Sequence, residues 1–271
     1  MTTASRLIHA PSRSSLTETI VIIATVTLLS VIPFSHRMSP WAAALAALLI
    51  FAAAIVKGNQ AFHLVLFTAA LTIMPLLHSS LHDWPLNLVT PLLIYLVVAL
   101  AVPRFRRSLL WLHCGRFGKD ILLLVIATAA ISCIALYIWS RVLKPDLSMH
   151  LKYIPDMPIW LFPLAGLGFS AFNAAIEEFV FRGVTMQALD SAFGPGIISI
   201  VLQAWPFGAM HYLEGVPNGA WGLAMTFVYG IMLGALRRRA QGLFAPWFAH
   251  VCADMMIFVI LAGLVLVQKR S

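Results

Sequence analysis

Long apolar runs, separated by short breaks rich in proline, glycine or charged residues, make up most of the chain. A helix needs about 20 apolar residues to cross the hydrocarbon core of a bilayer. Nine runs approach or exceed that length, near residues 18–34, 39–56, 61–77, 86–103, 120–140, 158–189, 196–212, 219–236 and 243–267. Backbone groups in lipid must be paired within the chain, so such runs form helices. The sequence predicts an all-α fold, a polytopic transmembrane helix bundle of about eight or nine spans.

Composition excludes an ordinary soluble domain. Hydrophobic residues make up 61% of the chain and charged residues only 10%, and the mean hydropathy is +0.92. A soluble domain carries about 25% charged residues. The runs 39–56 and 61–77 are short as separate full spans, which leaves eight helices as the alternative to nine.

The basic residues gather in loops between the apolar runs. With nine spans and the N-terminus inside, the inner segments hold Arg6, Arg13, Lys57, Arg104, Arg106, Arg107, Arg116, Lys119, Arg237, Arg238 and Arg239. The outer segments then hold only Arg37, Arg141, Lys144, Lys152, Lys269 and Arg270. This distribution predicts a multi-pass membrane protein with its N-terminus inside and its C-terminus outside.

The net charge of +8 has the same explanation. Basic loops at a membrane surface favour a bilayer with anionic headgroups as their partner. No separate basic domain is present to bind nucleic acid, so we expect no nucleic-acid partner. Tryptophans near the ends of the runs are expected to form an interfacial belt, namely Trp41, Trp84, Trp111, Trp139, Trp160 and Trp221.

Ionisable residues divide the chain into two parts. We expect a single transmembrane domain over residues 1–271, with no internal repeat. Residues 1–157 carry few ionisable groups within their spans and are interpreted as N-terminal scaffold helices. Residues 158–268 contain three polar motifs within apolar runs and are interpreted as catalytic helices.

The first motif places two adjacent glutamates and an arginine in an apolar run. A charged side chain in hydrocarbon costs a few kcal/mol, so it needs a partner and usually has a function. Glu178 and Arg182 are four residues apart, with the acid first, which favours an ion pair within the helix. Glu177 is rotated by about 100° from Glu178 and has no local counter-charge. A buried salt bridge that locks helix packing would explain Glu178 and Arg182 but not Glu177, which we interpret as a base.

The other two motifs contribute histidines. His211 lies near the end of a run, after Pro206, where a lone histidine is more often interfacial than catalytic. His250 and Asp254 are four residues apart within one run, so the carboxylate can fix the tautomer and the orientation of the ring. A satisfied buried pair without function is the alternative for these two residues.

The ordered motifs Glu-Glu-x-x-x-Arg, Phe-x-x-x-His and His-x-x-x-Asp resemble those of the CAAX-protease and bacteriocin-processing family of intramembrane endopeptidases. These enzymes are similar to the type II CAAX prenyl protease. The local sequences of residues 177–183 and 243–250 also fit, and the resemblance covers about residues 170–258. It implies that the motif residues form the active site of a peptidase.

The resemblance implies a role for each residue. Glu177, together with His211, matches the pair that activates water. Glu178 and Arg182 match the supporting ion pair. His250 and the residue at position 254 match groups that stabilise the oxyanion.

Asp254 departs from the asparagine that is commoner at this position. An ionised aspartate only accepts hydrogen bonds and cannot donate one to an oxyanion. Either Asp254 is protonated, or it orients His250 and leaves that ring to donate. We favour the second interpretation.

Metal dependence stays open at this stage. Glu177, His211 and His250 supply a two-histidine, one-carboxylate set of the type that holds catalytic zinc. There is no His-Glu-x-x-His sequence, and we favour water activated by glutamate and histidine, with no cofactor required and zinc as the alternative.

Helix geometry sets a condition on this site. At about 1.5 Å per residue, the three side chains lie at different depths along straight, untilted helices. We therefore expect tilted helices, or a break at Pro206, around a water-filled polar cavity among the C-terminal four helices.

The function predicted is hydrolysis of a peptide bond within the membrane, in a membrane-embedded or lipidated peptide or protein. A proteolytically silent membrane scaffold or immunity factor of the same fold is an alternative. An ion-coupled transporter, with the buried acids as relay groups, is a third hypothesis. It predicts an inverted repeat, which the sequence does not show.

Overall fold

The computed structural model describes residues 14–32, 40–56, 58–154, 156–213 and 215–268. Part of the charge count that predicts the orientation lies outside the described residues, at Arg6, Arg13, Arg37, Lys57, Lys269 and Arg270. The side chain of Trp41 is also outside them.

The described residues form helices joined by turns and short loops, without a strand, which confirms the all-α prediction. The α-helices are α1 (Leu16–Val31), α2 (Pro40–Val56), α3 (Asn59–Ile73), α4 (Leu86–Ala101), α5 (Pro103–Arg106), α6 (Lys119–Val142), α7 (Phe162–Glu178), α8 (Met186–Phe193), α9 (Ile197–Leu213), α10 (Gly219–Ala240) and α11 (Phe244–Gln268). A π-helical segment, η6 (Phe179–Thr185), joins α7 to α8. Short 3-10 segments are η2 (Met74–Leu76), η3 (Ser79–His82), η4 (Ser148–Tyr153) and η5 (Ile159–Leu161).

Several helices have the length and apolarity of membrane spans. Five reach that length within the described chain, over Asn59–Leu76, Lys119–Val142, Ile159–Phe193, Gly219–Ala240 and Phe244–Val267. Shorter apolar helices cover Leu16–Val31, Ala44–Ala53, Leu86–Ala101 and Ile197–Leu213. Each of the nine predicted runs thus corresponds to an apolar helical segment. The chain is a multi-pass integral membrane protein, and the number of helices that cross fully stays a prediction.

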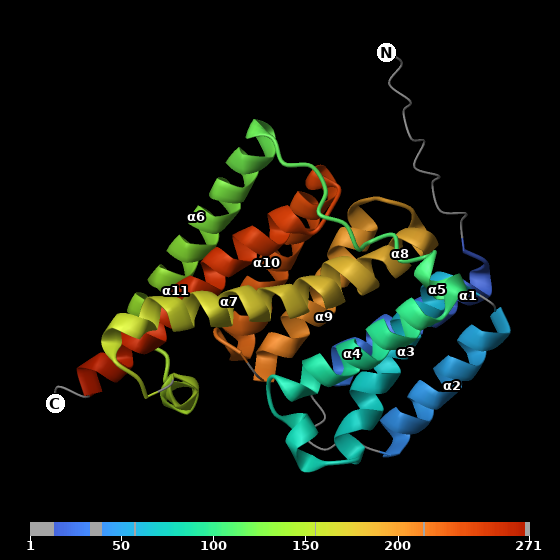
Figure 1. The fold of residues 1–271 in the computed structure, drawn as a ribbon, viewed down its shortest axis with the longest axis horizontal. Helices are drawn as coiled ribbons and strands as arrows, with labels where there is room; N and C mark the ends of the chain where they lie inside the picture. Colours follow the sequence, from blue (N-terminus) through green and yellow to red (C-terminus); the bar gives the residue numbers. More distant parts are fainter. Residues whose placement is uncertain (1–13, 33–39, 57, 155, 214, 269–271) are drawn as a thin grey trace.

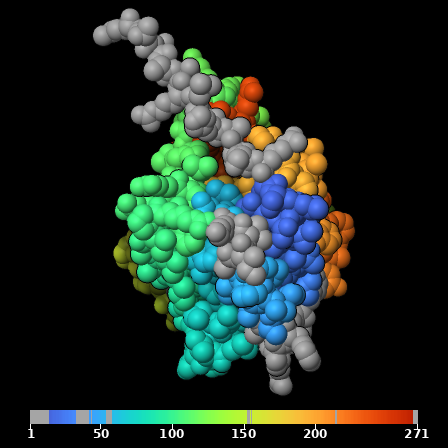
Figure 2. Space-filling model, turned by 90° about the vertical axis from the view of Figure 1, so that its right-hand side faces the viewer, coloured from blue at the N-terminus to red at the C-terminus, as the bar shows by residue number. Residues whose placement is uncertain are grey.

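The helices form two groups that meet along the motif-bearing segments. In Figure 1, α1–α4 lie together on one side of the molecule and α6, α10 and α11 on the other. Between them, α8 and α9 contact α1, and α7 contacts both α4 and α11. The space-filling view shows the N-terminal helices, coloured blue to cyan, covering one face (Figure 2).

A close contact without large side chains holds α9 against α10. A Cβ atom at Gly230 would lie 2.9 Å from the Cβ of Ala204, and one at Gly208 would lie 2.8 Å from the carbonyl oxygen of Leu223. Helices in lipid associate through such small residues, because close backbone approach supplies the dispersion attraction that binds them. This contact brings the backbone of α10 at Gly230 next to Phe207 on α9.

The two basic loops meet at one end of the bundle. The N–H of Arg116 donates to the carbonyl of Ala240 at 2.8 Å, and the N–H of Leu243 donates to the carbonyl of His113 at 3.0 Å. The loop before α6 therefore lies against the turn between α10 and α11. This contact agrees with the charge count, which places both loops on the same side of the membrane.

Two of the predicted interfacial tryptophans are instead buried. Trp111 is 0% exposed and packs against Phe179, with ring centroids 5.4 Å apart. Trp139 is buried against Leu261. The sequence places these tryptophans near span ends, but it does not show whether a loop folds back over the bundle. The loop that carries Trp111 does so and buries this side chain. Trp160 and Trp221 are exposed, as a belt would require.

Candidate active site

The predicted ion pair of the first motif is fully buried. Nη1 of Arg182 lies 3.0 Å from Oε1 of Glu178, and both side chains are 0% exposed. The two residues stand where α7 ends and η6 begins, at a local widening of the helix. Single π-helical turns of this kind often occur at functional sites, because they redirect side chains without ending the helix.

Arg182 has further partners that compensate its burial. Its Nη2 donates to the carbonyl oxygen of Gly230 at 3.4 Å. Its guanidinium also lies 4.2 Å from the ring centroid of Phe207, in cation–π contact. A buried charge that lost such partners would be costly, so Arg182 ties three helical segments to one another.

His250 contacts carboxylates from two helices. Its Nδ1 lies 2.8 Å from Oε1 of Glu178. Its Nε2 lies 3.4 Å from Oε2 of Glu177 and 3.6 Å from Oδ1 of Asp254. Tyr229 stands edge-on to the ring at 5.6 Å. These contacts fix the orientation of the imidazole.

The charges of this cluster require a shared proton. Nδ1 of His250 donates to Glu178, so Nε2 faces two carboxylates. An unprotonated Nε2 cannot donate to an ionised carboxylate and would face its lone pairs. Either Nε2 carries a proton, or one of the acids Glu177 and Asp254 does. In both cases, one mobile proton lies between His250 and these two acids.

Asn173 is a site residue that the sequence analysis missed. Its Nδ2 donates to Oε1 of Glu177 at 3.2 Å and to Oδ2 of Asp254 at 3.1 Å. Its Oδ1 accepts a hydrogen bond from Nε1 of Trp84 at 3.1 Å. Asn173 precedes Glu177 by one helical turn, so the four-residue spacing used for the other pairs could have found it. No local pattern links it to Trp84.

His211 lies apart from the carboxylates. Its Nδ1 bonds the carbonyl oxygen of Phe207 at 3.0 Å, so Nδ1 carries the proton and the neutral ring keeps an acceptor at Nε2. The ring stands edge-on to Phe207 at 5.2 Å, and His250 contacts the same phenyl ring at 5.8 Å. Among the described residues, no hydrogen bond joins His211 to Glu177.

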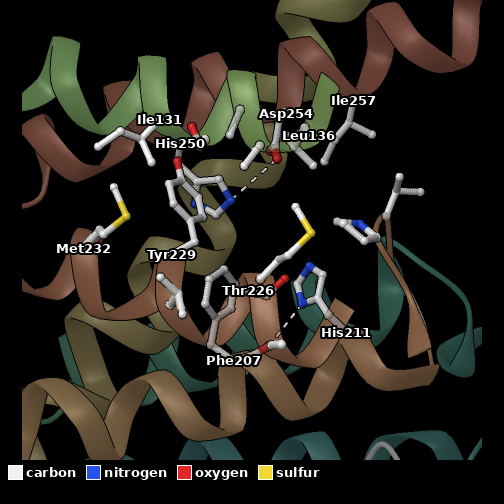
Figure 3. Close-up of a pocket in the computed structure, with 18 residues that line it drawn as sticks. Ile131, Leu136, Phe207, His211, Thr226, Tyr229, Met232, His250, Asp254 and Ile257 are labelled. Carbon is white, nitrogen blue, oxygen red and sulfur yellow. Dashed lines mark hydrogen bonds and ion pairs between the residues drawn. The ribbon is translucent and has the colours of Figure 1, made fainter. Parts of the chain in front are cut away.

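The two histidines line one cavity. It has a volume of about 300 Å³ and lies between α6, α9, α10 and α11. Figure 3 shows His250 and Asp254 on one side of this space and His211 with Phe207 on the other. Most other lining residues are apolar, including Ile131, Leu136, Met225, Val228, Met232 and Ile257.

This cavity differs from the expected one in two respects. It is bounded by α6 rather than α7, and Glu177 does not line it but contacts His250, which does. In addition, α9 continues through Pro206 without a break. In Figure 1, α7 crosses α11 at an angle, and this crossing brings Glu177 and Glu178 to His250.

The residues present do not fit the zinc set considered as an alternative. The part of the chain that the structure describes contains no group of three or more His, Cys, Asp or Glu placed to hold a metal ion. Glu177 and His250 are adjacent, but His211 stands across the cavity.

Comparison with known proteins bears on the motif region. Residues 158–256 match the family model described as type II CAAX prenyl endopeptidase Rce1-like. No curated protein and no solved structure matches the chain. The matched segment includes all six motif residues and excludes α1–α6. The resemblance read from the three motifs is confirmed: over residues 158–256 this chain is similar to the Rce1-like type II CAAX prenyl endopeptidases.

Proposed function

We propose that this membrane protein is an endopeptidase that hydrolyses a peptide bond within the bilayer, with water as the nucleophile. The family match supports a CAAX protease-type enzyme. The observation that carries the proposal is the contact between Glu177 and His250. Motif residues more than 70 positions apart meet with 3.4 Å between Oε2 and Nε2.

Glu177 is the general base in this proposal. Its Oε1 accepts from Asn173, whereas its Oε2 makes no hydrogen bond to a described residue. This oxygen is buried and its acceptor capacity is unused, and it lies 3.4 Å from Nε2 of His250, a residue that lines the cavity. Glu177 takes one proton from water as the water oxygen attacks the carbonyl carbon of the substrate.

The two histidines stabilise the developing charge and position the water, and Glu177 completes the reaction. The Nε2–H group of His250 donates a hydrogen bond to the oxygen that becomes negative and keeps its proton, with Asp254 orienting the ring. The acceptor Nε2 of His211 holds the attacking water from the opposite side of the cavity. The C–N bond then breaks, and the proton held by Glu177 passes to the leaving amine nitrogen, which closes the proton balance.

Glu178 and Arg182 support this chemistry without contacting substrate. Glu178 accepts from Nδ1 of His250 and fixes its tautomer, while Arg182 neutralises Glu178. Such a partner on the second ring nitrogen holds an imidazole in its working orientation.

The substrate class follows from the cavity and its surroundings. Apolar residues of α6 and α10 form a large part of the lining, and side chains such as Ile134 and Val228 are exposed on the outer surface of the bundle. We propose a membrane-embedded or lipidated peptide as substrate, in keeping with the prenyl endopeptidases that the family model describes.

The proposal is tested by comparing protein termini in membranes. Membranes from cells that produce the wild-type protein are compared with membranes from cells that produce Glu177→Ala or Glu177→Gln at equal abundance. We expect new termini that require the wild-type glutamate. A protein that only binds a partner would give the same termini in all three samples, and that result would refute the proposal.

A further inference from the structure

A single amide group bridges the two acids that face His250. Nδ2 of Asn173 carries two hydrogens, one for Oε1 of Glu177 at 3.2 Å and one for Oδ2 of Asp254 at 3.1 Å. Each acid thereby uses one oxygen on Asn173 and turns the other toward Nε2 of His250. The amide thus sets the spacing of α7 and α11 at the site.

Asn173 can do this only in one orientation of its amide. A rotation by 180° would place Oδ1, an acceptor, against two carboxylates. The indole N–H of Trp84 prevents this rotation, because it can only donate and needs Oδ1 at its side. Trp84 in turn packs against Phe169 of α7, with ring centroids 5.2 Å apart.

Trp84 belongs to the other half of the molecule. It lies between η3 and α4, outside the segment that matches the endopeptidase family. A contact between α4 and α7 brings this turn to the motif helix. The N-terminal half therefore contacts Asn173, which bridges the acids of the active site, through a donor-only group, the indole N–H of Trp84.

We propose that Asn173 is a positioning residue of the active site and that Trp84 orients its amide, so that the N-terminal half sets the placement of Glu177 and Asp254. This inference rests on the proposed function. It adds that catalysis at the full rate requires the contact of Trp84, in the turn before α4, with the motif helix α7.

The test is a double-mutant cycle on the purified full-length protein. The variants are Trp84→Phe, which keeps an aromatic ring on Phe169, Asn173→Ala and the double variant. The substrate is a peptide spanning a cleavage site identified by the comparison of termini. We expect kcat to fall about tenfold for Trp84→Phe, which removes one neutral hydrogen bond, and about 30-fold or more for Asn173→Ala, which removes two bonds to carboxylates, with KM changed by less than about twofold.

Coupling between the two changes is the decisive readout. Once Asn173 is alanine, Trp84→Phe should have no further effect on kcat. Independent, multiplicative losses would mean that Trp84 acts only through packing, and would overturn the inference. Trp160→Phe is the control, because Trp160 is 76% exposed and lies in η5, at the opposite end of α7 from Glu177; it should leave kcat unchanged.

A second measurement needs no substrate. Without the bridging amide, the carboxylates of Glu177 and Asp254 face each other unshielded, so Asn173→Ala should lower the melting temperature in detergent. Adding Glu177→Gln should recover part of that loss, whereas Glu177→Gln alone should not raise the melting temperature. Absence of this recovery contradicts the bridge even if cleavage is never observed. If Glu177→Gln restores the melting temperature but the wild-type protein cleaves no peptide, the bridge stands and only the proposed function is contradicted.

Discussion

The carboxylate of Asp254 stands where the motif of the family that this chain resembles more commonly has an asparagine. In the structure, one carboxylate oxygen accepts from Asn173 and the other faces Nε2 of His250 at 3.6 Å. Neither oxygen is needed as a donor to the substrate. The geometry supports the interpretation that Asp254 orients His250 and that the ring supplies the hydrogen bond to the oxyanion.

This interpretation predicts a graded response at position 254. Asp254→Asn keeps an acceptor for Asn173, so its kcat should stay within about tenfold of the wild-type value, equivalent to about 1.4 kcal/mol. Asp254→Ala removes both contacts, and its kcat should fall about 100-fold. Steady-state cleavage of the same peptide measures both. Equal losses in the two variants would show that the negative charge itself is required.

Residue spacing predicted part of the site and missed the rest for a physical reason. Glu178 with Arg182, and His250 with Asp254, are pairs within a helix, where a period of 3.6 residues fixes their proximity. The contact of Glu178 with His250 joins α7 to α11 and depends on how the helices cross. Helix crossings leave no periodic pattern in a sequence. The contact of Trp84 with Asn173 could not be predicted for the same reason.

Helix boundaries were more predictable than helix form. Apolar runs end where charged residues or glycine appear, so the ranges of α6 and α10 differ from the predicted ones by only a few residues. The run 158–189 was expected to be one helix but is divided into α7, η6 and α8. Within η6, Gly183 lies directly against Trp111, a contact from a distant loop that local sequence does not encode.

The close contact of α9 with α10 gives a prediction at the scale of these elements. Gly230→Leu would drive a side chain into Ala204 and Phe207 and displace the carbonyl that accepts from Arg182 and Gln203. We expect a loss of about 2–4 kcal/mol in stability, as overpacking and broken polar contacts produce, together with loss of cleavage.

The control for this prediction is a glycine with room around it. A Cβ atom at Gly263 in α11 would meet no atom within 4 Å. Gly263→Leu should therefore leave stability within about 0.5 kcal/mol and cleavage unchanged. Melting curves in detergent measure both variants. Similar losses for the two would show that α9 and α10 do not depend on close backbone approach.

The whole molecule combines a motif-bearing half with an N-terminal half that lies outside the segment matched by the family model. We propose that residues 1–157 act as scaffold, because α1 and α3 pack against α8, α1 also packs against α9, and the turn before α4 and the loop before α6 supply Trp84 and Trp111 to the motif segments. The two basic loops lie at one end of this bundle, joined by backbone hydrogen bonds. That end is the side of the membrane predicted to be inside.

The orientation can be tested with a cysteine already in the chain. Cys114 is exposed in the basic loop that precedes α6. With Cys133 and Cys252 replaced by alanine, a membrane-impermeant maleimide should label Cys114 only after the cells are permeabilised. Met149, in η4 beyond the other end of α6, is 76% exposed. In a Cys114→Ala background, Met149→Cys should be labelled in intact cells. The reverse pattern would invert the predicted topology.

The central claim is that Glu177 activates water beside His250, and single-turnover cleavage by the purified protein tests it most directly. With excess enzyme and a peptide substrate, Glu177→Gln should lower the rate constant at least about 1,000-fold, a loss of about 4 kcal/mol in transition-state stabilisation. Its melting temperature should stay close to the wild-type value, because glutamine retains an acceptor for Asn173. A Glu177→Gln protein that cleaves the peptide at the wild-type rate would contradict the account.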